Sequence, residues 1–381
     1  MSVDIAKPVA ALPGMEAFHP CTRAWFGDSF DGPTMIQRAA WPVLAAGRSG
    51  LLLAPTGSGK TLAAFLAAID RLMFHDIDRD AARGVRIVYV SPLKALAVDV
   101  DRNLRAPLAG IHATADRLGV SHHLPTVAVR SGDTSPAERR ELSRDPPDIL
   151  ITTPESLYLM LTAKSRAVLE SVDAVIVDEI HAVAATKRGT HLFLSLERLE
   201  RLRRQARPDG PPLQRIGLSA TQRPLEEIAR LLGGAEATAD PEQPPRPRPV
   251  EIIDASEPKR LELTVEVPVE DMANLSRPQE ITPGPTAGPA QPPSIWPAIH
   301  PRLVALIRAH RSTMIFVNSR RLAERLSAAI NELADEEIAM AHHGSIARPQ
   351  RVAIEDRLKR GQLPAIVATS SLELGIDMGA V

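Results

Sequence analysis

Residues 56–61 combine two glycines, a lysine and hydroxyl side chains, which is the composition of a phosphate-binding loop. They follow the apolar run 51–53 and precede a segment with apolar residues at helical spacing. Glycines let backbone N–H groups surround phosphate oxygens, Lys60 supplies positive charge for the β- and γ-phosphates, and Thr61 offers a hydroxyl to Mg²⁺. Ala54 replaces the first glycine of the general pattern, yet the strand and helix around the loop favour phosphate binding over a plain turn. The residues predicted to bind nucleotide here are Thr56, Gly57, Ser58, Gly59, Lys60 and Thr61.

Two adjacent carboxylates, Asp178 and Glu179, follow the apolar run 174–177. Because neighbouring side chains at a strand end point in different directions, Asp178 can hold Mg²⁺ while Glu179 activates a water molecule. Alone, such a pair is more often a solvated strand end, and a lone His181 is more often structural. Their position between a phosphate loop and Ser219-Ala220-Thr221 instead predicts the second half of an ATP-hydrolysing site. The predicted catalytic residues are Lys60, Asp178, Glu179 and His181, and the predicted Mg²⁺ ligands are Thr61 and Asp178.

Two further apolar runs end in a hydroxyl residue followed by proline, at Ser91-Pro92 and Thr153-Pro154. Ser and Thr are common N-caps and proline is common at the first helical position, so each pair predicts a helix start. A helix start presents free N–H groups and a positive dipole end, which suits the phosphates of a nucleic-acid strand. The alternative is that each pair only caps a strand-to-helix junction. The segments 130–134 and 187–189 are further candidates for backbone contact, although short charge runs are usually solvated faces.

The elements that position these residues follow from the apolar pattern. Short apolar runs at 51–53, 85–90, 148–151, 174–177 and 216–218 alternate with helix-type segments. This pattern is typical of a parallel sheet covered on both faces, which is a doubly wound α/β domain. Ligands bind such sheets at the carboxyl ends of the strands, where all the segments described above lie.

A second α/β pattern follows a proline-rich stretch. Nearly half of the 34 prolines fall between 240 and 301, where a strand is predicted only at 261–267. Beyond it the pattern predicts a helix from about 301, a strand at 313–317, helices at 320–333 and 349–360, and a strand at 365–368. The predicted domains are 1–239, a connector at 240–298, and 299–381. Since a parallel-sheet domain rarely closes in so few residues, we expect the second domain to be truncated and the chain to be a fragment.

Composition narrows the class of protein. The 381 residues are 44% hydrophobic and 24% charged, which is ordinary for soluble globular domains. A net charge of −1 weighs mildly against nucleic-acid binding, and 3% aromatic residues leave little for base stacking, so a bound strand would be held by its backbone. A single cysteine, the lack of a signal peptide and the lack of about 18 consecutive apolar residues predict a cytoplasmic protein that does not bind membranes.

The motifs together resemble superfamily 2 helicases of the DExH-box type. Residues 54–61, 178–181 and 218–221 are similar to motifs I, II and III of that group. Upstream, 33–37 resembles the adenine-reading Q motif, which implies that Gln37 contacts the base. Downstream, 315–320 resembles motif IV and 368–377 resembles motif V, which implies two RecA-like domains of the P-loop NTPase fold.

Within that group the sequence of the motifs resembles that of the large helicase-related, or Lhr-type, proteins. The similar stretches begin at Ala54, Val90, Ile149, Asp178 and Ile315. The resemblance implies ATP-driven 3′-to-5′ movement along single-stranded DNA, unwinding of duplexes including RNA–DNA hybrids, and a link to DNA repair. Motif VI should follow motif V and lies beyond the sequence, so we expect this piece to bind ATP and hydrolyse it poorly.

The resemblance also assigns residues. Gly375 and Asp377 are expected near the nucleotide, and Ser219 and Thr221 are expected to couple the two sites. The residues expected to contact the nucleic acid are Ser91, Pro92, Lys94, Arg130, Thr152, Thr153 and Thr369. Two alternatives stay open: an RNA helicase of the same superfamily, and a module that clamps nucleic acid in an ATP-dependent way without moving. The sequence does not indicate an oligomeric state.

Overall fold

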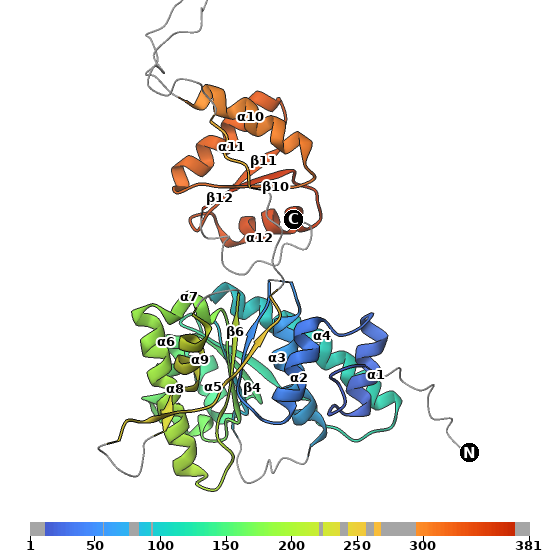
Figure 1. Ribbon diagram of the computed structural model, residues 1–381, viewed down its shortest axis with the longest axis vertical. Coiled ribbons are helices and arrows are strands. Elements are labelled where there is room, and N and C mark those ends of the chain that lie inside the picture. The colour runs from blue at the N-terminus through green and yellow to red at the C-terminus, as the bar shows by residue number, and fades with distance from the viewer. Residues whose placement is uncertain are drawn as a thin grey trace, which may run out of the picture. The chain divides into compact units, whose positions relative to one another are not determined.

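A computed structural model shows the fold and describes residues 12–55, 57–75, 84–92, 94–220, 224–236, 243–256, 263–267 and 295–369. The chain folds as two compact units, Met1–Pro258 and Lys259–Val381 (Figure 1). Among the described residues, no helix is long and apolar enough to cross a membrane.

The first unit is built on a seven-stranded sheet whose neighbouring strands are all parallel, in the order β3-β4-β2-β5-β6-β1-β9. Its strands are β1 (Gly50–Leu53), β2 (Ile87–Val90), β3 (Val127–Arg130), β4 (Ile149–Thr152), β5 (Ala174–Val177), β6 (Gln214–Ser219) and β9 (Glu251–Asp254). An antiparallel pair lies apart from it, β7 (Ala235–Glu236) and β8 (Arg246–Pro247). Because all seven strands run the same way, their carboxyl ends share one edge of the sheet, as the sequence predicted.

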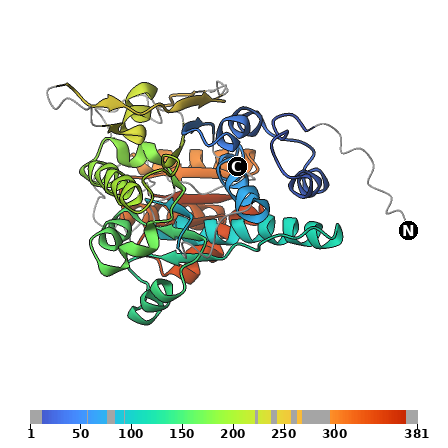
Figure 2. The ribbon, with the colours of Figure 1, turned by 90° about the horizontal axis from the view of Figure 1, so that it is seen from below.

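Helices cover both faces of this sheet, so the predicted doubly wound α/β fold is confirmed. The helices are α1 (Pro20–Ser29), α2 (Met35–Ala45), α3 (Lys60–Phe74), α4 (Lys94–Arg117), α5 (Pro136–Arg144), α6 (Pro154–Leu161), the 3₁₀ helix η1 (Lys164–Leu169), α7 (Ile180–Ala184), α8 (Lys187–Ala206) and α9 (Leu225–Gly233). Figure 1 shows α2, α3 and α4 on one side of the sheet and α6, α8 and α9 on the other. The two groups, coloured blue to teal and green, are also separate in Figure 2.

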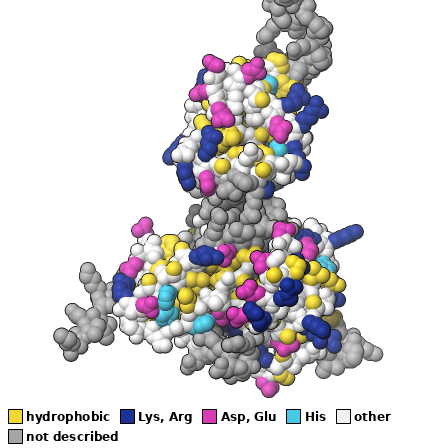
Figure 3. Space-filling view, turned by 180° about the vertical axis from the view of Figure 1, so that it is seen from behind, with side chains coloured by type: hydrophobic (Ala, Val, Ile, Leu, Met, Phe, Trp, Pro, Cys, Tyr) yellow, Lys and Arg dark blue, Asp and Glu magenta, His cyan; other side chains and the backbone are white. Residues whose placement is uncertain are grey.

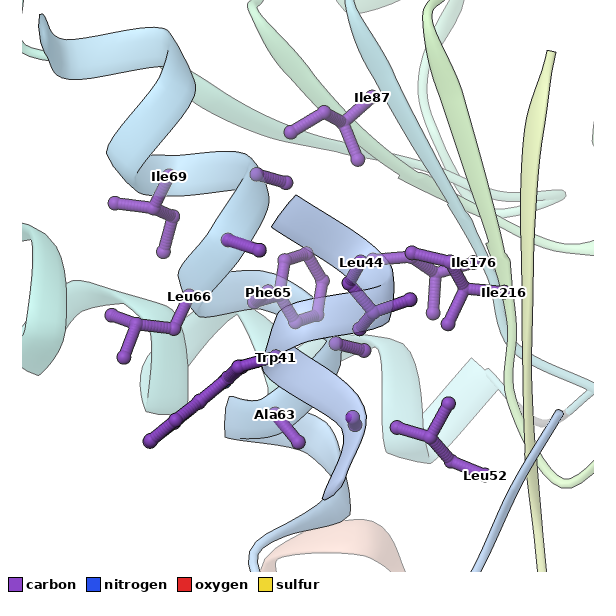
Figure 4. Packing of buried hydrophobic residues seen from close by; sticks show 14 of the residues in the cluster. Trp41, Leu44, Leu52, Ala63, Phe65, Leu66, Ile69, Ile87, Ile176 and Ile216 are labelled. Atoms are coloured by element: carbon purple, nitrogen blue, oxygen red, sulfur yellow. The ribbon is translucent and has the colours of Figure 1, made fainter. Parts of the chain in front are cut away.

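Alternation along the strands divides the core into two layers. Leu52 packs in the cluster with α2 and α3, whereas its neighbours Leu51 and Leu53 pack with α7, α8 and α9. Successive strand side chains point to opposite faces, so a strand buried on both faces must be apolar throughout. Figure 4 shows residues of the first layer, where Phe65 of α3 stacks on Tyr89 of β2. Trp41 of α2 packs edge-on against Phe18 and Phe26.

The second unit contains a three-stranded parallel sheet in the order β10-β12-β11. Its elements are α10 (Trp296–Ala309), β10 (Thr313–Phe316), α11 (Arg320–Ala334), β11 (Ala339–His342), α12 (Arg348–Lys359) and β12 (Ala365–Ala368). Helices α10 and α11 bury one face of this sheet and α12 buries the other. The helices and strands predicted between 301 and 368 are therefore present, with β11 in addition.

The proline-rich stretch differs from the prediction. Residues 263–267 form no strand, and Leu263 and Val265 are 88% and 85% exposed; residues 261 and 262 lie outside the described residues. Alternation alone does not make a strand when no sheet edge accepts its hydrogen bonds. The stretch does supply β9, which pairs with β1, and which the prediction missed together with β3. β3 and β9 include charged or small residues, so the apolar pattern did not indicate them. They form because they pair with strands that are distant in the sequence.

Candidate functional site

The loop between β1 and α3 has the backbone that phosphate binding requires. Gly57 and Gly59 have φ angles of 78° and 84°, in the left-handed region that favours glycine. A Cβ atom at Gly59 would also lie 2.6 Å from Nε2 of Gln37. The φ angle therefore favours glycine at residue 59, and a Cβ atom there would also displace the end of the Gln37 side chain. Thr56 lies outside the described residues.

The polar groups of the loop fit an anionic ligand. Lys60 Nζ donates to the carbonyl oxygens of Ala54 and Pro55, the latter at 2.8 Å, so the ammonium lies within the loop. Among the described residues, the Ser58 hydroxyl is buried and has no hydrogen-bond partner. A phosphate oxygen would satisfy this group, together with the N–H groups at the start of α3.

Gln37 lies against the loop through a capping box. Its backbone N–H donates to the Thr34 hydroxyl at 3.4 Å, and its Oε1 accepts from the Thr34 N–H at 2.9 Å. Its Nε2 donates to the Gly59 carbonyl at 3.4 Å, and the side chain is buried. The structure thus joins the start of α2 to the phosphate loop, while the adenine contact of Gln37 stays a prediction.

The acid pair follows β5, two strands from β1 in the sheet. Asp178 Oδ2 accepts a hydrogen bond from the Tyr89 hydroxyl, and Oδ1 accepts from the Glu179 N–H at 2.9 Å. Glu179 has a φ of 42°, an unfavourable angle for a residue with a Cβ atom. The two carboxylates have different partners, because Asp178 accepts from Tyr89 while Glu179 Oε2 lies 3.3 Å from His181 Nε2, in keeping with the proposed division of roles. Thr61 and Asp178 carry oxygen atoms of the kind that Mg²⁺ prefers, and their binding of Mg²⁺ stays a prediction.

Burial controls the charge of this pair. It raises the pKa of Asp178 to about 6, although the hydrogen bond from Tyr89 favours the ionised form. Burial also raises the pKa of Glu179, against the opposing effect of Lys60. A carboxylate with a raised pKa is a better proton acceptor than an exposed one, which suits Glu179 as a general base.

His181 connects the acid pair to the end of β6. Its Nδ1 accepts from the Ala220 N–H at 3.3 Å and lies 3.3 Å from the Ser219 hydroxyl. Nε2 must then carry the proton, and it lies 3.3 Å from Glu179 Oε2. Burial lowers the pKa of His181, with Lys60 acting in the same direction, which agrees with a neutral ring. His181 thus connects Ser219 and Ala220 of the third motif to the Glu179 carboxylate. Thr221 lies outside the described residues.

The phosphate loop and the acid pair form a first row of residues along the carboxyl edge of the sheet. The residues predicted to bind a nucleic-acid strand, at the ends of β2, β3 and β4, form a second row on the same edge, the strand-binding row. The Thr152 hydroxyl donates to the Arg130 carbonyl at 2.8 Å, and the Ser91 N–H donates to the Thr152 carbonyl at 2.9 Å. The Asp178 N–H then donates to the Val90 carbonyl at 2.9 Å. These bonds link the ends of β3, β4, β2 and β5, so the row is continuous with the acid pair.

One of the two predicted helix caps is confirmed. Thr153 caps α6, with its hydroxyl 3.4 Å from the Ser156 N–H, and Pro154 is the first helical residue. The described part of α4 begins at Lys94, so Pro92 is not its first residue as predicted; Leu93 lies outside the described residues. Ser91, Thr152 and Thr153 are buried, so their side chains position the backbone rather than face solvent.

Arg188 holds both junctions in place. Its guanidinium donates to both carboxylate oxygens of Glu155, on the first turn of α6, and to the Pro92 carbonyl at 2.6 Å. The sequence suggested Arg188 as a contact to nucleic acid, whereas the structure shows it bonded within the protein. The structure also shows that Tyr89 donates a hydrogen bond to Asp178, a role that the sequence analysis did not predict. The sequence feature that could have indicated it is a polar hydroxyl in an otherwise apolar strand.

The remaining predicted residues add no described side-chain contact to this row. Only the backbone of Lys94 is described, and Arg130 is buried, which lowers its pKa. Thr369 follows β12 in the second unit and donates its N–H to the His342 carbonyl at 3.2 Å. Gly375 and Asp377 lie beyond the described residues. Contacts of these residues with ligands stay predictions.

Two helicase family models match the sequence. The DEAD/DEAH box helicase model matches residues 34–228, and the helicase conserved C-terminal domain model matches residues 299–381. Similar curated proteins include an Lhr helicase/probable uracil glycosylase of Mycolicibacterium smegmatis, 49% identical over 96% of this chain, and an Lhr helicase/uracil glycosylase of Escherichia coli, 43% identical over 99%. This chain spans only 24% and 26% of their lengths.

Solved structures show the same fold. The structure of Mycobacterium smegmatis helicase Lhr bound to ssDNA and AMP-PNP is 50% identical, with a TM-score of 0.75 over 97% of this chain and 44% of that one. Mss116p bound to ssRNA and AMP-PNP is 15% identical, with a TM-score of 0.66 over 98% of this chain and 67% of that one, and it supports the fold alone. The two predicted RecA-like domains are therefore confirmed.

Proposed function

Because the chain belongs to the DEAD/DEAH box helicase family, we propose that it couples ATP hydrolysis to 3′-to-5′ movement along single-stranded DNA. The movement would unwind DNA or RNA–DNA duplexes in DNA repair, within the cytoplasm. The ssDNA and AMP-PNP in the solved relative, and the helicase names of the curated relatives, support the nucleotide and the track.

One observation carries the proposal: two functional rows share one edge of a single sheet. The phosphate loop and the acid pair follow β1 and β5, while the junctions that begin at Ser91 and Thr153 follow β2 and β4 on the other side of β5. The bond from the Asp178 N–H to the Val90 carbonyl joins the rows directly. We propose that this backbone hydrogen bond transmits a displacement of the acid pair to the strand-binding row.

The residues of the first row suit hydrolysis of a phosphoanhydride. Lys60 and the glycine backbone bind the phosphates, and Glu179 accepts a proton from the attacking water. Thr61 and Asp178 would hold Mg²⁺, which offsets phosphate charge when bound. Ser219 and His181 link this carboxylate to β6, and Gln37 adjoins the loop from α2.

The second row suits a phosphate backbone. The start of α6, capped by Thr153, presents N–H groups and a positive dipole end without needing a net positive surface. Lysine and arginine are interspersed with acidic side chains on the described surface drawn in Figure 3, in keeping with the net charge of −1. We propose that Lys94, and Thr369 of the second unit, also contact nucleic acid.

Turnover with different polymers tests the proposal. ATP hydrolysis by the chain and by Lys60→Ala is measured with single-stranded DNA, with single-stranded RNA and without polymer. Because this piece is expected to hydrolyse ATP poorly, each rate is compared with the rate without polymer. Stimulation by DNA that is lost in Lys60→Ala supports the proposal, and stronger stimulation by RNA would favour the RNA helicase. AMP-PNP-dependent strand binding without stimulated turnover would favour the clamp. Release of streptavidin from one biotinylated DNA end then tests the direction, and release from the 5′ end alone is expected.

A further inference from the structure

Three potential metal ligands meet at the far end of α4. His112 and Asp116 lie one turn apart on the helix, and His122 lies in the segment that follows it. One ligand atom from each residue lies within 4.8 Å of the others. The ring nitrogens His112 Nδ1 and His122 Nε2 are 2.6 Å apart, and Asp116 Oδ1 is 3.9 Å from the same Nε2.

The orientation of His122 leaves a lone pair directed at this cluster. Its Nδ1 lies 2.9 Å from the Val120 carbonyl, which accepts hydrogen bonds only, so Nδ1 carries the proton. In the neutral ring the lone pair is then on Nε2, which accepts the hydrogen bond from His112 Nδ1, and a metal ion would replace that proton. Metal-binding histidines are commonly held in this way, with the second ring nitrogen donating to a backbone carbonyl. The side chain is 7% exposed and lies beside Phe74, so few other orientations are open to it.

We propose that His112, Asp116 and His122 form a binding site for a divalent transition-metal ion, with Zn²⁺ as its representative. Two imidazoles and a carboxylate suit zinc, cobalt and nickel better than Mg²⁺, which prefers oxygen ligands alone. Three protein ligands leave a fourth position for water. In a tetrahedral site with bonds of about 2.0 Å, the two nitrogens lie roughly 3.3 Å apart. His112 must therefore move by less than about 1 Å.

Binding at this cluster would not enter the ATP chemistry. At about 1.5 Å per residue, His112 lies roughly 27 Å along α4 from Lys94, which is at the carboxyl edge of the sheet. The ion would instead join the last turn of α4 to the segment that leads into β3. Metal binding should therefore raise thermal stability and leave basal ATP turnover unchanged.

Titration of the full chain tests the site. After chelator treatment, Zn²⁺ binding is measured by calorimetry and Co²⁺ binding by visible absorption. One ion per chain is expected, and Zn²⁺ at about a hundredfold excess over Kd should raise the Tm by roughly 5–10 °C. His122→Ala and Asp116→Asn should each weaken binding at least about tenfold.

Asp116→Asn is the decisive variant, because an exposed residue is replaced and folding is preserved. His310→Ala, at an exposed histidine of the second unit, is the matched control and should bind as the unchanged chain does. Equal Zn²⁺ affinity in Asp116→Asn and His310→Ala would overturn the proposal. Lack of stoichiometric binding in the unchanged chain would overturn it as well.

Discussion

Replacing Arg188 with alanine tests how the strand-binding row is held together. The guanidinium bridges Glu155, at the start of α6, to the Pro92 carbonyl, after β2. Its hydrogen bonds to Glu155 lower the pKa of that carboxyl, which stays ionised at neutral pH. In Arg188→Ala, an unpaired negative charge would stand where the helix start should receive a phosphate.

The size of the effect follows from charge and exposure. The Arg188 and Glu155 side chains are 38% and 56% exposed, so losing the pair itself should cost at most about 1 kcal/mol of folding stability. A like charge about 4 Å from a phosphate costs about 1 kcal/mol in water and more near protein. Strand affinity should therefore fall roughly tenfold, while ATP affinity stays unchanged because Arg188 does not contact the phosphate loop.

Anisotropy of a labelled oligonucleotide measures the strand affinity. Arg198→Ala removes the same charge from the same helix, at an exposed arginine over the Tyr158 ring, and should change the affinity less than about threefold. The double variant Glu155→Ala/Arg188→Ala should recover part of the loss, because the unpaired carboxylate is gone. If the double variant binds no better than Arg188→Ala, the charge explanation is wrong.

Three further predictions concern stability and turnover. Thr153→Val removes the cap of α6 and should cost about 1 kcal/mol, seen as a Tm lower by roughly 2–4 °C; an unchanged Tm would contradict the cap. Glu179→Gln should lower ATP turnover at least about a hundredfold with ATP binding retained. It should also raise the Tm, because burial raises the pKa of Glu179 and so disfavours its charged form. Retained turnover would exclude Glu179 as the base. Burial opposes ionisation of Glu197, but Arg248 and Arg215 outweigh it and hold its pKa low. The ionised Glu197 therefore stabilises the fold above about pH 4.3, the pKa of the unfolded chain, and this stabilisation is lost as the pH falls through the folded pKa. The urea midpoints of the unchanged chain and of Glu197→Gln should therefore converge in acid. A constant difference would refute this linkage.

Local chemistry made much of the site predictable. Glycines at 57 and 59, a lysine and a hydroxyl at the start of a helix, and a threonine before a proline are features of neighbouring residues. Their conformations depend on the backbone freedom of glycine and on capping, which act within a few residues. The apolar runs likewise predicted five of the seven strands of the large sheet, because strands buried on both faces are apolar throughout.

The order of the strands and the partners of the charged side chains were decided only by the tertiary structure. β9 exists because β1 accepts its hydrogen bonds, while 263–267 has a suitable alternation and joins no sheet. Arg188 could equally have faced a phosphate, and only the packing of α6 and α8 brings it to Glu155. Tyr89 meets Asp178 because β2 lies beside β5. Such contacts join residues far apart in the chain, and their geometry depends on how whole elements pack, which short-range sequence patterns do not specify.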